Sequence, residues 1–193
     1  MTVFYTSDPH WGHRFVAGLR GFGEDAHAHD EWLRKIYSEA FRPGDVVWWL
    51  GDLTMRLPPV DAAATTIATR ASADHRLIYG NHDAGHPMHR EAHRHQHAYY
   101  GFKLAAPFAK RVLPKVGAVH LSHFPYDGDH GPDRYPQWRL RDVGVPLIHG
   151  HTHGTERVTR SAAGTLQIHV GIDAWKRPVP EHEIVDLILQ ESP

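Results

Sequence analysis

Cysteine is absent from the 193 residues of this chain. Disulfide bonds, thiolate metal ligands and thiol catalysis are therefore excluded. The same absence excludes zinc fingers and zinc deaminases, because both need cysteine ligands. Any metal site in this protein must therefore be built without thiolate ligands.

Long apolar runs and a strong charge of one sign are also missing. No apolar run approaches the roughly 18 residues of a membrane-spanning helix. The chain opens without a basic and apolar leader, so we expect a cytoplasmic protein that is neither secreted nor membrane-bound. The formal net charge is −1, whereas domains that hold long nucleic acid are usually strongly basic. We therefore expect no stable binding of long nucleic acid, while a small nucleotide stays open as a substrate.

The composition is otherwise that of a globular protein, with 41% hydrophobic and 22% charged residues. This length and composition predict a single domain over residues 1–193 with its own hydrophobic core. The oligomeric state stays open. Histidine is unusually frequent, with 19 copies, and the question is which of them are ligands.

Apolar periodicity predicts alternating strands and helices. We expect helices at 25–41, 59–72 and 181–190. A hairpin is expected over 109–122, and strands are expected at 2–6, 46–50, 76–79, 118–121, 146–148, 156–160 and 165–170. Five of these strands run directly into segments that contain Asp, Asn or His. Because ligand sites of open α/β folds lie at the carboxyl ends of strands, these segments predict one shared site.

The residue types in these segments suit metal ions. Asp8 and His10, and likewise His151 and His153, are spaced so that both side chains of each pair would lie on one side of an extended segment. The candidate ligands are Asp8, His10, Asp52, Asn81, His123, His151 and His153. Oxygen and imidazole ligands without sulfur favour divalent manganese, iron or zinc. Two such ions about 3.5–4 Å apart can polarise a phosphoryl group and generate hydroxide near neutral pH.

The order of these motifs resembles that of the calcineurin-like metallophosphoesterase superfamily. The motifs are Asp8-Pro9-His10, Gly51-Asp52, Gly80-Asn81-His82-Asp83, His123 and Gly150-His151-Thr152-His153. The stretches Asp8-Pro9-His10-Trp11-Gly12-His13 and Val170-Gly171-Ile172-Asp173-Ala174-Trp175 are similar to a compact subgroup from bacteria and their phages. The resemblance covers nearly the whole chain. It implies a four-layer α/β sandwich, with two packed mixed β-sheets flanked by helices.

The resemblance also implies roles for these residues. It places Asp8, His10, Asp52 and His153 on a first metal ion, and Asp52, Asn81, His123 and His151 on a second. Manganese is the expected metal, with iron or zinc as alternatives. A hydroxide between the ions would attack phosphorus, and His82 would assist the leaving group. Many members continue Gly-Asp with x-x-Asp, but here Met55 holds that place. The partner that orients His82 therefore stays open, with the adjacent Asp83 as one candidate.

The implied activity is hydrolysis of small phosphodiesters, with 2′,3′-cyclic nucleotides as the best single guess. Alternatives that could use the same centre are a phosphomonoesterase, a protein phosphatase, a dinucleoside polyphosphate hydrolase and a nuclease. A non-catalytic binding scaffold would be expected to lose ligands, and this sequence keeps them. His13 and Arg14 follow the first motif closely enough to contact a substrate phosphate.

Other histidines are expected to be structural or surface groups. The cluster His86, His89, His93, His95 and His97 predicts a solvated face beside the site, and His27, His29 and His182 are expected at the surface. His149 and His169 are expected to be buried. The loop from Phe124 to Leu140 combines aromatic and Arg side chains, a mixture that can stack a base.

Overall fold

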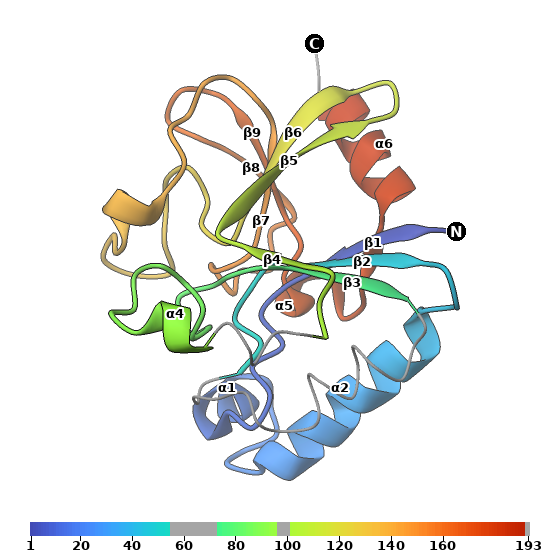
Figure 1. The fold of residues 1–193 in the computed structure, drawn as a ribbon, viewed down its shortest axis with the longest axis vertical. Coiled ribbons are helices and arrows are strands. Elements are labelled where there is room, and N and C mark those ends of the chain that lie inside the picture. Colours follow the sequence, from blue (N-terminus) through green and yellow to red (C-terminus); the bar gives the residue numbers. More distant parts are fainter. Residues whose placement is uncertain (55–72, 96–100, 192–193) are drawn as a thin grey trace.

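The computed structural model describes residues 1–54, 73–95 and 101–191 (Figure 1). The predicted helix at 59–72 and His97 lie outside these residues. None of the helices within the described ranges is long and apolar enough to cross a membrane.

The first sheet has five strands in the order β10-β1-β2-β3-β4. The strands are β1 (Val3–Thr6), β2 (Val46–Trp49), β3 (Asp74–Ile78), β4 (Leu104–Ala106) and β10 (Val179–Pro180). β1 to β4 run parallel, and β10 pairs antiparallel with β1. The parallel strands therefore end at the same edge of the sheet, which places the segments after β1, β2 and β3 next to one another.

The second sheet also has five strands, in the order β5-β6-β7-β9-β8. The strands are β5 (Phe108–Leu113), β6 (Gly117–Ser122), β7 (Leu147–His149), β8 (Val158–Arg160) and β9 (Leu166–His169). The predicted hairpin is confirmed as the antiparallel pair β5–β6. β6, β7 and β9 are parallel, so the segments after β6 and β7 also share one edge.

Helices flank the two sheets. Figure 1 shows α1 (Arg14–Leu19) and α2 (Ala26–Ala40) on the side of the first sheet that faces away from the second sheet. α6 (Glu181–Glu191) packs beside β1, β9 and β10. The remaining helices are single turns: α4 (Ala92–His95), α5 (Ile172–Trp175) and the 3-10 helix η2 (Pro136–Trp138). The predicted architecture of two mixed sheets flanked by helices is confirmed.

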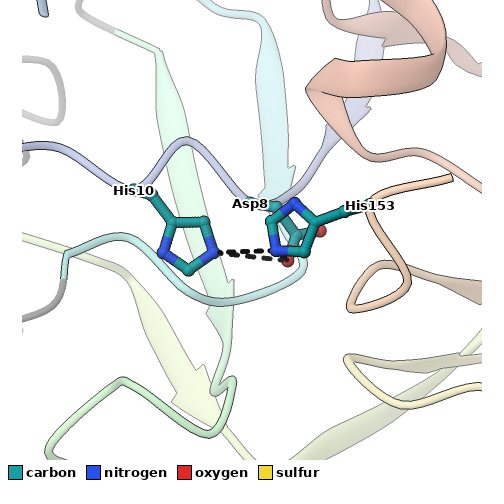
Figure 2. Close-up of side chains that lie close together, drawn as sticks. All are labelled: Asp8, His10 and His153. Atoms are coloured by element: carbon teal, nitrogen blue, oxygen red, sulfur yellow. Dashed lines mark hydrogen bonds and ion pairs between the residues drawn. The ribbon is translucent and has the colours of Figure 1, made fainter. Parts of the chain in front are cut away.

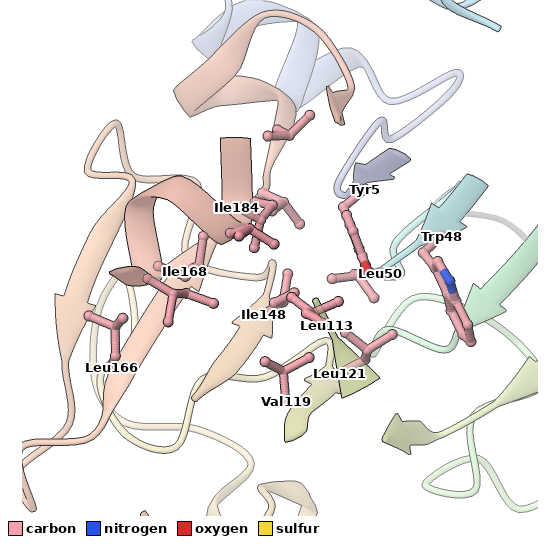
Figure 3. Close-up of a cluster of buried hydrophobic side chains, with 14 of the residues drawn as sticks. Tyr5, Trp48, Leu50, Leu113, Val119, Leu121, Ile148, Leu166, Ile168 and Ile184 are labelled. Atoms are coloured by element: carbon pink, nitrogen blue, oxygen red, sulfur yellow. The ribbon is translucent and has the colours of Figure 1, made fainter. Parts of the chain in front are cut away.

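Strand β2 explains how one strand supports two cores. Trp48 and Leu50 belong to the cluster between the sheets, whereas Val47 and Trp49 face the cluster under α2. In Figure 3, Leu50 lies among Leu113, Leu121 and Ile148 of the second sheet, and Trp48 lies at the edge of the same cluster. The continuous apolar run that predicted a strand buried on both faces is thus confirmed. The sequence did not predict α1, β4, β10 or α5, since two to six residues are too few to show a period.

Candidate metal centre

One group of candidate ligands combines the segment after β1 with the segment after β7. Nε2 of His10 lies 3.2 Å from Nε2 of His153. Oδ1 of Asp8 lies 3.9 Å from the first of these nitrogens and 4.0 Å from the second. Figure 2 shows the two rings turned toward each other beside the Asp8 carboxylate. These are three of the four residues expected on a first metal ion, and they could hold one.

A second group gathers around His123, which follows β6. Its Nε2 lies 3.2 Å from Oδ1 of Asn81 and 3.3 Å from Nδ1 of His151. These residues follow β3, β6 and β7, so both sheets contribute. All three side chains are buried. The grouping matches the set expected on a second metal ion.

Asp52 joins the two groups. Its Oδ2 lies 3.6 Å from Nε2 of His10 and 3.4 Å from Nε2 of His123. Its Oδ1 accepts a hydrogen bond from the backbone N–H of His82 at 2.9 Å. A single carboxylate therefore faces one imidazole of each group, which is the placement that a shared ligand needs.

The spacing of two ring-nitrogen pairs fits bound cations. Two ligand atoms about 2.1 Å from one ion lie about 3.0–3.4 Å apart at tetrahedral to octahedral angles. The ring-nitrogen pair of His10 and His153 is 3.2 Å apart, and that of His123 and His151 is 3.3 Å apart. The donor set of carboxylate, amide and imidazole suits divalent ions of the first transition row. These buried Asp and His clusters could therefore bind metal ions.

The backbone of the ligand segments departs from the expected extended conformation. Eight non-glycine residues among those described have positive φ, and five of them are candidate ligands: Asp8, His10, Asp52, His151 and His153. The expectation that these pairs lie on extended segments was therefore wrong, although Asp8 and His10 still lie in one group that could hold an ion. Cross-segment hydrogen bonds hold the turned conformation, for example from Asp8 N to Gly51 O at 3.0 Å and from His10 N to Asp52 O at 3.1 Å. Such φ values are uncommon outside glycine and concentrate at functional sites.

Glycines in these segments are needed because the segments touch. A Cβ on Gly80 would lie 2.1 Å from Oδ1 of Asp52, and one on Gly150 would lie 1.9 Å from Oγ of Ser7. Both distances are far shorter than a van der Waals contact. The second contact joins the two sheets, and there the backbone N–H of His151 also donates to the Asp8 carboxylate at 3.0 Å.

Hydrogen bonds on the far side of three rings define which nitrogen faces the centre. Nδ1 of His123 donates to Leu50 O at 2.7 Å, which leaves Nε2 as its inward atom. Nδ1 of His153 donates to Asp173 at 2.9 Å with the same result. Nε2 of His151 lies 3.2 Å from Asp129, so Nδ1 faces the centre instead. Such outer bonds fix the tautomer and the orientation of a metal-binding ring.

The protonation of the rings follows from burial and from the carboxylates. Burial lowers the pKa of His10 well below its usual value and that of His151 to about 4, so both rings are neutral and able to bind a cation. His123 is also buried, but the Asp52 carboxylate raises its pKa to about 9. Cation binding at His123 must therefore release a proton.

His82 lies at the partly open side of the centre. Its side chain is 34% exposed, and Nε2 lies 3.8 Å from Oδ2 of Asp52. Asp83 points elsewhere: its carboxylate accepts hydrogen bonds from the backbone N–H groups of Asp52, Leu53 and Gly80. The carboxylate that faces His82 is thus that of Asp52.

The two residues expected to contact a phosphate lie in different places. The ring of His13 is 5.4 Å from that of His10, and its Nδ1 caps the start of α1 by accepting from Val16 N. Arg14 forms an exposed ion pair with Glu24 at 3.1 Å. The structure therefore brings His13 beside the centre and does not bring Arg14 there.

Two histidines expected at the surface are buried. His29 lies one turn before Leu33 on the face of α2 that packs inward, and it accepts a hydrogen bond from Arg20 at 2.9 Å. His86 packs against Trp138 and Phe124, with ring centroids 5.2 and 5.8 Å apart. Both expectations were wrong because tertiary contacts cover these positions. His149 and His169 are buried as expected.

Three residues of the centre were missed as participants by the sequence analysis: Arg20, Asp129 and Asp173. Asp173 stands in the 170–175 stretch that carried part of the resemblance, which was the one available signal. Arg20 and Asp129 stand in segments without a motif. In the loop 124–140, Tyr126 is buried and its hydroxyl donates to Val145 O at 2.8 Å. This residue therefore anchors the loop.

The fold and the centre define the class of protein: a two-sheet α/β sandwich with a buried Asp and His centre at the carboxyl ends of its strands. No protein-family model matches the chain. The chain is 42% identical to the Gene 66 protein of Mycobacterium phage L5, over 96% of this chain and 93% of that protein. It therefore belongs to the family of the phage Gene 66 proteins.

Two solved structures align with this chain. The crystal structure of AQ665 from Aquifex aeolicus aligns with a TM-score of 0.67 and 21% identity, over 96% of this chain and 98% of that one. Phosphopantetheinyl hydrolase from Mycobacterium tuberculosis aligns with a TM-score of 0.49 and 13% identity, over 92% and 95% of the two chains. The first similarity supports the fold alone, and the second is too low to support an argument.

Proposed function

We propose that this protein is a metal-dependent phosphodiesterase that binds two divalent ions and hydrolyses small phosphodiesters, with 2′,3′-cyclic nucleotides as the preferred class. The observation that carries the proposal is the convergence of seven candidate ligands from both sheets, with Asp52 facing an imidazole of each group. The order of the motifs, which resembles that of the metallophosphoesterases, supports the reaction type. Manganese is the proposed metal.

The proposal assigns the candidate ligands to two metal ions. Asp8, His10, Asp52 and His153 would hold one ion, and Asp52, Asn81, His123 and His151 the other. Bound ions would polarise the phosphoryl group and activate water near neutral pH. The chain's own part is to keep His10 and His151 neutral by burial and to fix the ligand geometry through the turned backbone of the segments.

His82 is the proposed catalytic residue. It is the partly exposed imidazole beside Asp52, so a departing oxygen on the open side could reach its ring. Burial lowers its pKa, which favours a neutral ring at neutral pH. In this form a ring N–H can donate a hydrogen bond to the charge that develops on the leaving oxygen. His13, whose ring lies 5.4 Å from that of His10, would contact a non-bridging phosphate oxygen. Arg14 is not assigned this role, because its exposed guanidinium pairs with Glu24 away from the centre.

The test is turnover by metal-stripped protein resupplied with Mn²⁺. The substrates are 2′,3′-cyclic AMP, 3′,5′-cyclic AMP, bis(p-nitrophenyl) phosphate and p-nitrophenyl phosphate. We expect metal-dependent hydrolysis of the diesters, with the 2′,3′-cyclic nucleotide preferred. His82→Ala should lower kcat by about 10²–10⁴-fold while the protein keeps its metal. Asp52→Asn should lose both metal and turnover.

The matched control is His27→Ala, because this histidine is exposed on α2 and makes no contact with the centre. Its turnover should equal that of the wild type. Hydrolysis of the monoester alone would overturn the diester assignment in favour of a phosphomonoesterase. Two bound ions without turnover of any substrate would overturn the enzyme proposal in favour of a binding scaffold.

A further inference from the structure

We propose that Asp129 and Asp173 are positioning residues, each of which fixes one ring of the His151-Thr152-His153 segment so that the two rings offer different nitrogens to two metal ions. The inference rests on the metal centre of the proposed function. It concerns the geometry of the ligands and does not depend on which substrate is hydrolysed.

Asp173 holds His153. Its Oδ2 accepts from Nδ1 of His153 at 2.9 Å, which leaves Nε2 to face His10 and Asp8. Arg20 fixes the carboxylate in turn by donating from Nε and Nη2, each at 2.8 Å. With both carboxylate oxygens engaged by the guanidinium, Asp173 cannot rotate away from the ring.

Arg20 also fixes the backbone of the segment that carries Asp8 and His10, two other ligands expected on the first ion. Its Nη2 donates to the carbonyl oxygen of Asp8 at 2.7 Å, and its Nη1 donates to that of Pro9 at 2.8 Å. The guanidinium side chain is 3% exposed. It therefore ties the turned segment that carries Asp8 and His10 to the carboxylate that orients His153.

Asp129 holds His151 from a different element. Its Oδ2 lies 3.2 Å from Nε2 of His151, so the opposite nitrogen faces His123. The Asp129 side chain is fully buried, although neighbouring residues of its loop are exposed. Backbone N–H groups of His130 and Arg134 donate to its two oxygens, at 2.7 and 3.2 Å. The loop therefore buries the Asp129 carboxylate against the candidate ligand His151 and satisfies both of its oxygens with hydrogen bonds.

A third metal ion is the competing explanation for Asp129, because Asp129, His130 and His151 also lie close enough to share one. Two guanidinium groups argue against it. Arg134 donates to Nε2 of His130 at 2.7 Å, and Arg139 lies 3.7 Å from Oδ2 of Asp129. Because Nε2 of His130 accepts from Arg134, its Nδ1 carries the proton and faces Oδ1 of Asp129 at 3.0 Å as a donor. The ring nitrogen next to Asp129 therefore cannot bind a further ion, and the two guanidinium groups offset the charge of the carboxylate.

Each carboxylate should therefore act on one ion. Loss of an outer carboxylate typically costs about 10–100-fold in metal affinity, because the ring loses its fixed tautomer and orientation. We expect Asp173→Ala to weaken the ion at His153 and Asp129→Ala to weaken the ion at His151. The other ion should keep its affinity within about threefold, since the two carboxylates share no hydrogen-bond partner.

The experiment is a Co²⁺ titration of metal-stripped protein, followed by visible absorption and compared with the single variants His151→Ala and His153→Ala. The step weakened by Asp173→Ala should be the one lost in His153→Ala, and the step weakened by Asp129→Ala the one lost in His151→Ala. Asp129→Asn and Asp173→Asn keep an acceptor oxygen, so they should recover most of the lost affinity. These variants also serve if an alanine variant does not fold.

The matched control is Asp142→Ala. Asp142 also anchors a loop, through Ser161, Thr165 and the backbone of Gly144, but contacts no candidate ligand. Its two Co²⁺ steps should equal those of the wild type. Unchanged steps in both alanine variants, or equal weakening of both steps, would overturn the positioning roles. A wild type that binds two ions but hydrolyses nothing would overturn the proposed function alone, whereas a wild type that binds no Co²⁺ would overturn this inference as well.

Discussion

The two sheets bring different ligand atoms to one centre. The segments after β1, β2 and β3 supply every oxygen ligand, namely Asp8, Asp52 and Asn81, together with His10. The segments after β6 and β7 supply imidazoles alone: His123, His151 and His153. Neither sheet holds a complete ligand set for two ions. The centre therefore exists only where the sheets pack, and ligand geometry should depend on the contact between them.

A second polar contact between the sheets differs in kind. Tyr5 of the first sheet, Arg111 of the second sheet and Glu181 of α6 form a polar link. The Tyr5 hydroxyl donates to Glu181 at 2.7 Å and accepts from Arg111 at 2.9 Å. No candidate ligand belongs to this link. The comparison teaches that one interface contains a chemical junction where the candidate ligands meet, an apolar core, and a separate structural junction without candidate ligands.

Gly150→Ala should have the largest effect, because it breaks the chemical junction itself. The new methyl group would lie 1.9 Å from Oγ of Ser7 and 2.5 Å from Oδ2 of Asp8, so this carboxylate must move. A ligand displaced by about 1 Å costs on the order of 100-fold in rate, and overpacking costs about 1–3 kcal/mol in the free energy of unfolding. Turnover, metal content and urea denaturation measure the three losses.

Gly131→Ala is the control for this prediction, because a Cβ at Gly131 meets nothing within 4 Å. It should behave as the wild type. If Gly150→Ala kept full metal content and full stability, the two sheets would not be in the close contact described at Asp8.

Ile148→Ala tests the apolar core between the two sheets. Ile148 is fully buried between the sheets (Figure 3). Its truncation should lower the free energy of unfolding by about 2–5 kcal/mol, as measured by urea denaturation. Val112→Ala on β5 is the control: that side chain is 71% exposed, so the change should stay within about 0.5 kcal/mol. Equal losses in both variants would mean that Ile148 does not support the packing of the two sheets.

Arg111→Met should have the smallest effect and sharpens the contrast between the two junctions. The change removes the hydrogen bond to Tyr5 and the ion pair with Glu181 at 2.9 Å. We expect a loss of about 1 kcal/mol in the free energy of unfolding, with turnover unchanged. Lys110→Met, on the exposed face of the same strand, should change neither quantity. A fall in turnover with Arg111→Met alone would mean that the structural junction also supports the centre.

Much of the fold could be predicted because its strands are short apolar runs with a polar ending. Val46–Trp49 and Leu147–His149 were found from composition alone, and each delivers a glycine and a candidate ligand. The left-handed backbone at Asp8 and His10 could not be predicted, since it is imposed by hydrogen bonds to a segment more than 40 residues away. The burial of His86 could not be predicted either, because it depends on Trp138 of a distant loop.

By itself the sequence determined which residue types can bind a metal and that each candidate follows a strand. These are local properties of composition, spacing and apolar runs. Only the tertiary structure decided which nitrogen of each ring faces the centre and that Asp129, Asp173 and Arg20 belong to it. The physical reason is that ring orientation depends on hydrogen bonds between segments far apart in the chain, such as Asp173 with Arg20, 153 residues away. No local pattern in the sequence encodes such a contact.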